Sequence, residues 1–334
     1  MRRFFLVLVV LVAAFGVWFV FKSYTWPIWT EHGVAELEAI EVNGDKQWLL
    51  IRGEDRRAPV LLFLHGGPGM PAMYLAYAFQ RPLEQEFVVV HWDQRGAGKS
   101  FRDDIDPATL STSQLLRDAE VVIAHLRAKL GARKLVLIGH SHGSYLGALL
   151  AQRRPDLIAA YVGIGQMAED PVPEQVAFLR SKLETIGLPE NTVIDGRNRE
   201  DLLFRTGSAI VGATSPLPLI LTGLASNEYS LFDGLNVAKG PRLYARHMKY
   251  DLVRSTLSDE VTTFDVPVYF MMGRYDMVTP VSQARRYFDK LTAPQKRWIE
   301  FQRSAHFPFF EEPGEFANAM REVKGKIAAD PAKP

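Results

Sequence analysis

The sequence comprises 334 residues, of which 47% are hydrophobic, so the chain is long enough to bury a sizeable core in one or two domains. Lysine and arginine total 39 against 38 aspartates and glutamates, a balance that argues against nucleic-acid binding and favours small, near-neutral ligands. Because cysteine is absent, disulfides, thiolate catalysis and cysteine metal sites are excluded.

The N-terminus differs from the rest of the chain. An apolar run of about 18 residues, FFLVLVVLVAAFGVWFVF, begins at Phe4 and has nearly the length needed to cross a bilayer. Arg2 and Arg3 precede it, which favours a cytoplasmic N-terminus. Residues 1–26 are therefore predicted to form a membrane anchor, with the catalytic domain outside the cytoplasm, in the periplasm if the source is a Gram-negative bacterium. The alternatives are a secretory signal that is cleaved, leaving a secreted protein, and a buried core helix.

Short apolar runs alternate with helical patterns from residue 35 onward. Residues 35–42 and 46–52 flank an Asn-Gly pair, which predicts an antiparallel hairpin. The later runs are apolar throughout, as in strands that are covered on both faces. Together they predict one mostly parallel sheet of eight strands with helices on both faces. These later runs are PVLLFLHG from Pro59, EFVVVHWD from Glu86, KLVLIGHS from Lys134, LIAAYVGIG from Leu157, VPVYFMMG from Val266 and KRWIEFQ from Lys296.

The segments between the strands carry helix signals. Ser111 and Gln114 form a capping-box pattern at the start of one helix, and Gly131 suits its end. Residues 167–260 contain no strand pattern, and are predicted to form an inserted helical cap whose first helix covers residues 173–186. The core then comprises residues 35–166 and 261–326, and residues 327–334 are predicted to be a disordered tail.

The sequence Gly139-His140-Ser141-His142-Gly143 fits the pattern G-x-S-x-G between an apolar strand and a helix. A tight strand-to-helix turn would place Ser141 at its apex, and the glycines would prevent clashes around it. Ser141 is therefore the candidate nucleophile. The histidine pair also suggests a metal site, but the two residues flank the apex and no further ligand has suitable spacing, so no metal is expected.

A serine nucleophile needs a base, and the base needs an orienting carboxylate. Asp276 follows the seventh predicted strand and His306 follows the eighth, so both are expected at the same sheet edge as Ser141. The chain order Ser, Asp, His is that of α/β-hydrolases. In HGGPG, Gly66 or Gly67 would donate an N–H to the developing oxyanion, together with the N–H of His142.

The segment GAGKS at residues 96–100 suggests part of a phosphate-binding loop. The full motif needs a glycine where Asp93 stands, so nucleotide binding is not expected. Asp93 and Arg95 are instead predicted to brace the floor of the site by ion pairing.

In their order along the chain, HGGPG, WDQRGAGKS, GHSHGS, GRYDMVTP and SAHFPFFEEP resemble the proline iminopeptidase-like branch of the α/β-hydrolases, over nearly all of residues 35–325. The resemblance implies the α/β-hydrolase fold and a serine hydrolase that releases an N-terminal residue, often proline, or acts on related amides and esters. His142 stands where the family usually has tryptophan. The family's cap motif for the substrate amine is missing, and Glu169, Glu174 and Glu228 are the possible substitutes.

The predicted mechanism uses Ser141 as nucleophile, His306 as general acid and base, and Asp276 as the orienting carboxylate, without a metal or organic cofactor. The expected substrate is a short peptide or small molecule, and no nucleic-acid partner is expected. An alternative function is a carboxylesterase for small or lipophilic esters, motivated by the missing amine motif. A non-catalytic binding protein that has kept the fold is a third possibility.

Overall fold

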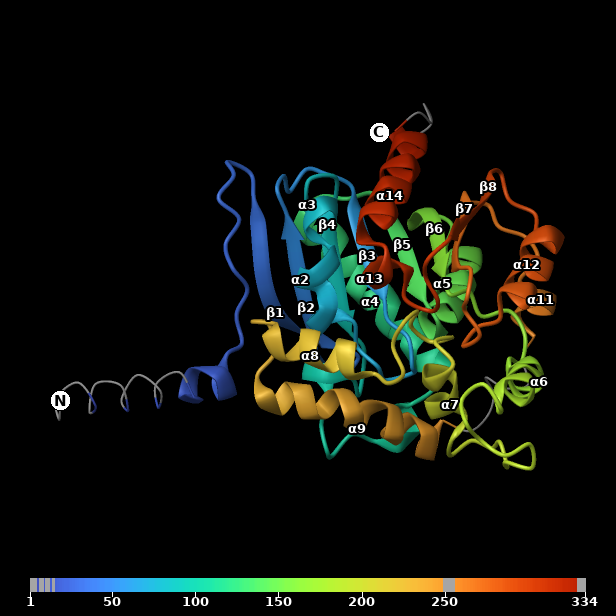
Figure 1. Cartoon of the computed structure of the whole chain (residues 1–334). Coiled ribbons are helices and arrows are strands. Elements are labelled where there is room, and N and C mark those ends of the chain that lie inside the picture. The colour runs from blue at the N-terminus through green and yellow to red at the C-terminus, as the bar shows by residue number, and fades with distance from the viewer. Residues whose placement is uncertain (1–4, 6–8, 10–12, 14–15, 249–255, 329–334) are drawn as a thin grey trace.

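A computed structural model describes residues 5, 9, 13, 16–248 and 256–328 of the chain (Figure 1). Its strands form one sheet in the order β1-β2-β4-β3-β5-β6-β7-β8. β1 and β2 pair antiparallel with each other, β2 pairs antiparallel with β4, and all later pairs are parallel. The predicted mostly parallel sheet of eight strands is therefore confirmed. The bounds are β1 Val34–Val42, β2 Asp45–Gly53, β3 Val60–Leu64, β4 Val88–Asp93, β5 Leu135–His140, β6 Ile158–Ile164, β7 Val268–Gly273 and β8 Lys296–Phe301.

The hairpin between β1 and β2 turns at the predicted Asn-Gly pair. Asn43 has φ 48° and Gly44 has φ 75°, and Val42 pairs with Asp45 across the turn. Two successive positive φ angles match the right-handed twist of the flanking strands, which is why Asn-Gly is favoured there.

Apolar side chains fill both faces of the sheet. Along β3, Leu61 and Phe63 belong to one buried cluster, and Leu62 and Leu64 to the other. Because successive residues of a strand point to opposite faces, an uninterrupted apolar run requires cover on both sides. Residues of α4, α5 and α12 pack in one cluster, and residues of α2, α13 and α14 in the other, so helices cover both faces (Figure 1).

The helix α4 begins as its sequence predicts. The Ser111 hydroxyl accepts a hydrogen bond from the Gln114 N–H at 3.2 Å, and Gly131 ends the helix with φ 69°. The Gln114 side chain does not complete the capping box, because its Oε1 accepts a hydrogen bond from Arg117 and its Nε2 donates to Asp118 at 2.7 Å. The bounds of the helices in the core are α2 Ala76–Phe79, α3 Arg81–Glu84, α4 Thr112–Leu130, α5 His142–Arg153, α12 Val281–Lys290, α13 Pro308–Glu311 and α14 Pro313–Ala328, with short 3₁₀ turns at Met73–Leu75, Gly98–Ser100 and Pro107–Thr109.

The described residues between β6 and β7 contain helices and no strand, as the sequence of the predicted cap indicates. The helix predicted at residues 173–186 is α6, which is shorter because it ends at Lys182 and the chain turns at Gly187 with φ 72°. In Figure 1, α8 and α9 lie side by side below the sheet. The division into core and cap stays a prediction. The helices here are α6 Val172–Lys182, α7 Arg199–Arg205, α8 Leu217–Ala225, α9 Leu231–His247 and α11 Leu257–Glu260.

The predicted membrane location is wrong. Within the part of the chain that the structure describes, no helix is both long enough and apolar enough to cross a membrane. Part of the apolar run at residues 4–21 lies outside the described residues, and residues 16–21 are helical. The next residues lie against the folded domain, since Lys22 Nζ donates to the Leu224 carbonyl at 2.7 Å and Tyr24 N–H to the Asn227 carbonyl at 3.0 Å. At the other end, α14 includes residues 327–328 of the predicted tail, and residues 329–334 lie outside the described residues.

Candidate active site

Ser141 lies at the apex of a sharp turn between β5 and α5. Its φ of 55° and ψ of −123° fall outside the conformations that a serine ordinarily adopts. The backbone around it is fixed on both sides, because Ser141 N–H donates to the Ile164 carbonyl at 2.9 Å and Ser144 N–H donates to the Ser141 carbonyl at 2.8 Å. This geometry is that of a nucleophile elbow.

The glycines of the motif are required by close approaches of the backbone. A Cβ at Gly139 would lie 2.2 Å from the Gly143 carbonyl oxygen, and a Cβ at Gly143 would lie 2.1 Å from the Leu64 carbonyl oxygen. No side chain fits at such distances, so the turn can form only with glycine at both positions.

Asp276 and His306 meet at the same edge of the sheet. His306 Nδ1 lies 2.8 Å from Asp276 Oδ2, and both side chains are buried. Asp276 Oδ1 accepts hydrogen bonds from the N–H groups of Val278 and Thr279, at 2.8 and 2.9 Å, so the carboxylate is held from its other side. A fixed carboxylate on Nδ1 leaves Nε2 as the ring nitrogen that can accept a proton.

The turn that carries Ser141 adjoins His306 through the end of β6. Ile164 accepts the Ser141 N–H, and the next residue, Gly165, is so close to His306 that a Cβ there would lie 2.9 Å from His306 Cε1. The hydrogen bonds of these described residues include none between Ser141 Oγ and the His306 ring. Such bonds often form only once substrate is bound.

His140 contacts the main chain of the candidate catalytic histidine, which the sequence motif did not indicate. Its Nε2 lies 2.8 Å from the His306 carbonyl oxygen, to which it donates, and the two rings are 4.6 Å apart. Burial lowers the pKa of His140 well below its usual range, so the ring is neutral. Only the fold reveals this contact, because 166 positions separate the two residues.

The predicted oxyanion donors lie beside the nucleophile to different degrees. A Cβ at Gly66 would be 2.9 Å from Ser141 Cβ, whereas the neighbours of Gly67 are Met70 and Gly69 in its own turn. His142 begins α5, and its ring is buried without a hydrogen-bond partner. Burial lowers the pKa of His142 to about 3, so its imidazole is neutral at the site. Gly66 therefore lies against Ser141, whereas Gly67 lies against its own turn.

The glutamates considered for the substrate amine are engaged elsewhere. Arg286 donates to Glu169 at 2.7 Å and to Glu174 at 2.9 Å, in a partly exposed cluster between α6 and α12. Glu228 is buried and accepts hydrogen bonds from Ser226 at 2.8 Å and from Thr25 at 3.0 Å. None of the three has a contact with Ser141 or His306 among these bonds.

Asp93 and Arg95 do not pair with each other. Arg95 donates to Asp118 at 2.7 Å, while Asp93 accepts from the Lys99 N–H at 2.8 Å and from the Tyr229 hydroxyl. The two residues therefore hold different elements: Arg95 holds α4 against the sheet, and Asp93 holds Tyr229, two residues before α9.

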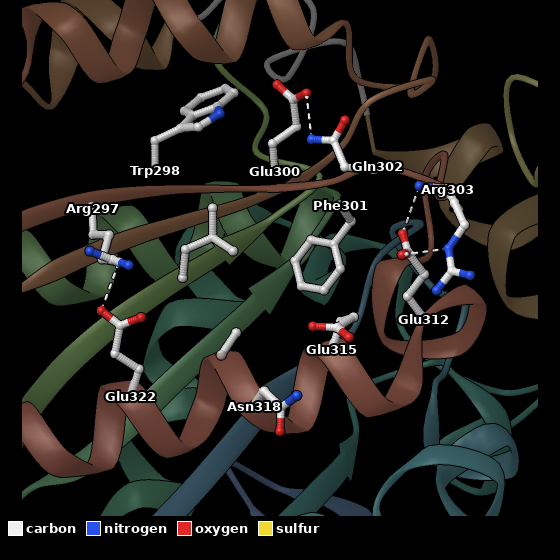
Figure 2. Close-up of a pocket in the computed structure, with 12 residues that line it drawn as sticks. Arg297, Trp298, Glu300, Phe301, Gln302, Arg303, Glu312, Glu315, Asn318 and Glu322 are labelled. Carbon is white, nitrogen blue, oxygen red and sulfur yellow. Dashed lines mark hydrogen bonds and ion pairs between the residues drawn. The ribbon is translucent and has the colours of Figure 1, made fainter.

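A groove of about 530 Å³ lies between β8 and α14, and Figure 2 shows the side chains that line it. Arg297 pairs with Glu322 there at 2.7 Å, and Glu312 pairs with Arg303 at 3.3 Å. Ser141, Asp276 and His306 are not among its lining residues. The groove is therefore separate from the candidate active site.

The fold and the site define a class of protein, the hydrolases with a nucleophile elbow. The family model for the alpha/beta hydrolase fold matches residues 59–313, and the chain belongs to this family of hydrolase enzymes.

Two relatives and one solved structure illustrate the similarity. The chain is 32% identical over 304 residues to a probable aminopeptidase, YbaC, of Bacillus subtilis, which covers 86% of this chain and 95% of that protein. It is 27% identical over 299 residues to a proline iminopeptidase of Heyndrickxia coagulans, covering 86% and 98% of the two chains. The crystal structure of a proline iminopeptidase from Mycobacterium smegmatis superposes with a TM-score of 0.64 at 21% identity, covering 88% of this chain and all of that one (100%). The resemblance seen in the motifs is thereby confirmed.

Proposed function

We propose that this chain is a serine aminopeptidase that releases the N-terminal residue of short peptides, with proline as a favoured residue. The observation that carries the proposal is the 2.8 Å contact between His306 Nδ1 and Asp276 Oδ2, at the sheet edge where Ser141 stands at the apex of its turn. The relatives named aminopeptidase and proline iminopeptidase support the substrate class.

The proposed reaction proceeds through an acyl-enzyme. Ser141 Oγ attacks the carbonyl carbon of the scissile amide while His306 Nε2 takes its proton. The N–H groups of His142 and of Gly66 or Gly67 stabilise the resulting oxyanion. His306 then returns the proton to the leaving amine, and water releases the acyl group by the same steps in reverse order.

Asp276 has two tasks in this proposal. Its bond to Nδ1 keeps the His306 proton away from Nε2, and its negative charge stabilises the imidazolium that forms when Ser141 is deprotonated. The donors on the other side of the carboxylate, Val278 N–H and Thr279 N–H, hold its plane in place. The ring therefore needs no reorientation when the proton arrives.

A second candidate function is a carboxylesterase. The observation that favours it is that Glu169 and Glu174 are both paired with Arg286, and that Glu228 is bonded to Thr25 and Ser226. None of these carboxylates is free to pair with a substrate ammonium group in the described state. An ester hydrolase would need no such group.

The two candidates are separated by a matched set of substrates. The enzyme is assayed with a prolyl arylamide, with its N-acetylated form and with a short-chain aryl ester, and Ser141→Ala serves as the blank. Turnover of the free-amine arylamide alone supports the aminopeptidase. If the ester dominates and acetylation makes no difference, the chain is an esterase and the aminopeptidase proposal is refuted. If Ser141→Ala hydrolyses all three at the wild-type rate, both candidates are refuted.

A further inference from the structure

Two consecutive glutamates follow the candidate catalytic histidine, and the proposed mechanism uses neither. They are Glu311, the last residue of α13, and Glu312. α13 is a single turn that reverses the chain after His306, which brings both carboxylates back against the loop of residues 303–307. The two carboxylates bond to different residues of this loop.

Glu311 holds the main chain on both sides of His306. Its Oε2 accepts the N–H of Ala305 at 3.0 Å and the N–H of Phe307 at 3.0 Å, and its Oε1 also accepts from Ala305 at 3.1 Å. The residues immediately before and after the catalytic histidine are thus bonded to one carboxylate. A shift of this carboxylate would move the His306 backbone with it.

The same carboxylate reaches a segment between α7 and α8. Glu311 Oε1 accepts the N–H of Val211 at 2.8 Å, and the His306 N–H donates to the Ala209 carbonyl at 3.0 Å. Close by, the Met277 N–H donates to the Ser208 carbonyl at 3.2 Å, next to the candidate catalytic aspartate. Residues 208–211 are therefore bonded both to the loop of His306 and to the loop of Asp276.

Within this loop, Glu312 bonds only to the first two residues. It accepts the Arg303 N–H at 2.9 Å and the Ser304 hydroxyl at 2.7 Å, and Figure 2 shows its pairing with the Arg303 side chain. These partners precede His306 by two and three positions in the chain. Glu312 thus secures the loop to α14, whereas Glu311 secures the histidine itself.

The hydrogen bonds that Glu311 accepts are charge-assisted. A carboxylate that accepts backbone N–H groups forms charge-assisted bonds, and these are shorter and stronger than bonds between neutral groups. An N–H that loses its acceptor in such a partly buried place is costly. A neutral amide in place of the carboxylate offers one acceptor oxygen instead of two, and its NH₂ group would face an N–H donor.

We propose that Glu311 is a positioning residue, which fixes the main chain of His306 for catalysis and joins it to residues 208–211 of the cap. The proposal rests on the proposed catalytic role of His306. It assigns Glu311 no contact with the substrate. The residue acts through the histidine that it holds.

The test compares Glu311→Gln with Glu315→Gln, a matched change at an exposed position in the first turn of α14. For both variants and the wild type, kcat and KM are measured with a short-chain aryl ester, together with the rate at which an aryl phosphonate labels Ser141. Displacing a catalytic group by about 1 Å costs up to roughly 100-fold in rate, so Glu311→Gln is expected to lower kcat and the labelling rate by about 10- to 100-fold, with KM within about threefold. Glu315→Gln is expected to match the wild type.

A readout on the cap tests the second part of the proposal. Hydrogen exchange of the peptide that spans residues 207–213 is expected to be faster in Glu311→Gln than in the wild type, and unchanged in Glu315→Gln. If Glu311→Gln does not fold, Glu311→Asp serves instead. The shorter carboxylate keeps the charge but cannot reach all three N–H groups, so kcat must still fall severalfold.

The outcomes that overturn the inference are distinct from failure of the proposed function. If folded Glu311→Gln has a lower Tm but labels and turns over at the wild-type rate, Glu311 is a structural residue only and the inference is wrong. Unchanged hydrogen exchange at residues 207–213 refutes the link to the cap. If the wild type itself is not labelled at Ser141, or if His306→Ala is labelled as fast as the wild type, the proposed function falls, and the inference with it.

Discussion

Replacement of Asp276 by asparagine tests the assigned role of the carboxylate most directly. Asp276 accepts hydrogen bonds on both oxygens: Oδ1 from the N–H groups of Val278 and Thr279, and Oδ2 from the Thr279 hydroxyl at 2.8 Å and from His306 Nδ1 at 2.8 Å. The two backbone N–H groups can only donate, so the asparagine oxygen must remain on their side. Its NH₂ group then faces Thr279 and His306.

The expected fall in kcat depends on whether each neighbour can accept a hydrogen bond from that NH₂ group. The Thr279 hydroxyl can rotate and accept, but His306 can accept only with an unprotonated Nδ1, which puts its proton on Nε2. In this tautomer the ring cannot take the proton of Ser141. We therefore expect kcat to fall by about 10⁴-fold, which corresponds to roughly 5.4 kcal/mol of activation free energy.

The assay is steady-state hydrolysis of the aryl ester, with thermal unfolding measured in parallel to establish that the variant is folded. Thr279→Val is the matched control, because it removes the second donor to Oδ2 and leaves the bond to His306. Loss of one hydrogen bond to a charged group is worth about 1.5–3 kcal/mol, so this control should lower kcat by at most roughly 100-fold, far less than the loss expected for Asp276→Asn. A folded Asp276→Asn enzyme that keeps more than a tenth of the wild-type kcat would refute the tautomer argument.

Three further changes have definite expected results. Gly165→Ala should lower kcat by about tenfold or more, because its Cβ would lie 2.9 Å from His306 Cε1 at a φ of +51°; ester kinetics measure this, and an unchanged kcat would contradict the placement of the ring. Glu174→Gln weakens an exposed ion pair with Arg286, so urea denaturation should show a change of at most about 1 kcal/mol, and a selective loss of activity on the free-amine arylamide would instead make Glu174 an amine ligand. Burial raises the pKa of Asp93 from 3.8 to about 7, so the folded state retains a proton that the unfolded chain releases, and this stabilisation is lost as the pH rises from about 4 to about 7. Asp93→Asn should flatten the fall in unfolding free energy between about pH 4 and pH 7, and an unaltered slope would mean that Asp93 is not its source.

The fold could be predicted because its signals are local. Each parallel strand carries an apolar run that needs cover on both faces, and the hairpin turn needs two positive φ angles that Asn43 and Gly44 adopt readily. The elbow at Ser141 is equally local, since a Cβ at Gly139 or at Gly143 would lie only 2.2 or 2.1 Å from a backbone carbonyl oxygen. Strand ends then bring Asp276 and His306 to the same edge.

The supporting residues could not be predicted, because their contacts are made with backbone groups. The carbonyl that His140 reaches and the N–H groups that Glu311 accepts exist at nearly every position of a chain, so no residue pattern marks them. The partners of Glu174 and Glu228 likewise depend on how the predicted cap lies on the core. The apolar N-terminal run illustrates the opposite error, in which a strong local signal led to a membrane location that the described helices do not support.

The contacts of residues 208–211 limit how the predicted cap can move. This segment is bonded to the loop of Asp276 through Ser208, to His306 through Ala209, and to Glu311 through Val211. A rigid lid that opened here would break these bonds and displace the groups that must stay aligned for proton transfer. Substrate entry is therefore expected to involve other parts of the cap, while residues 208–211 remain attached to the catalytic edge. Differences in substrate between relatives can then arise in those other parts without disturbing the geometry of Ser141, Asp276 and His306.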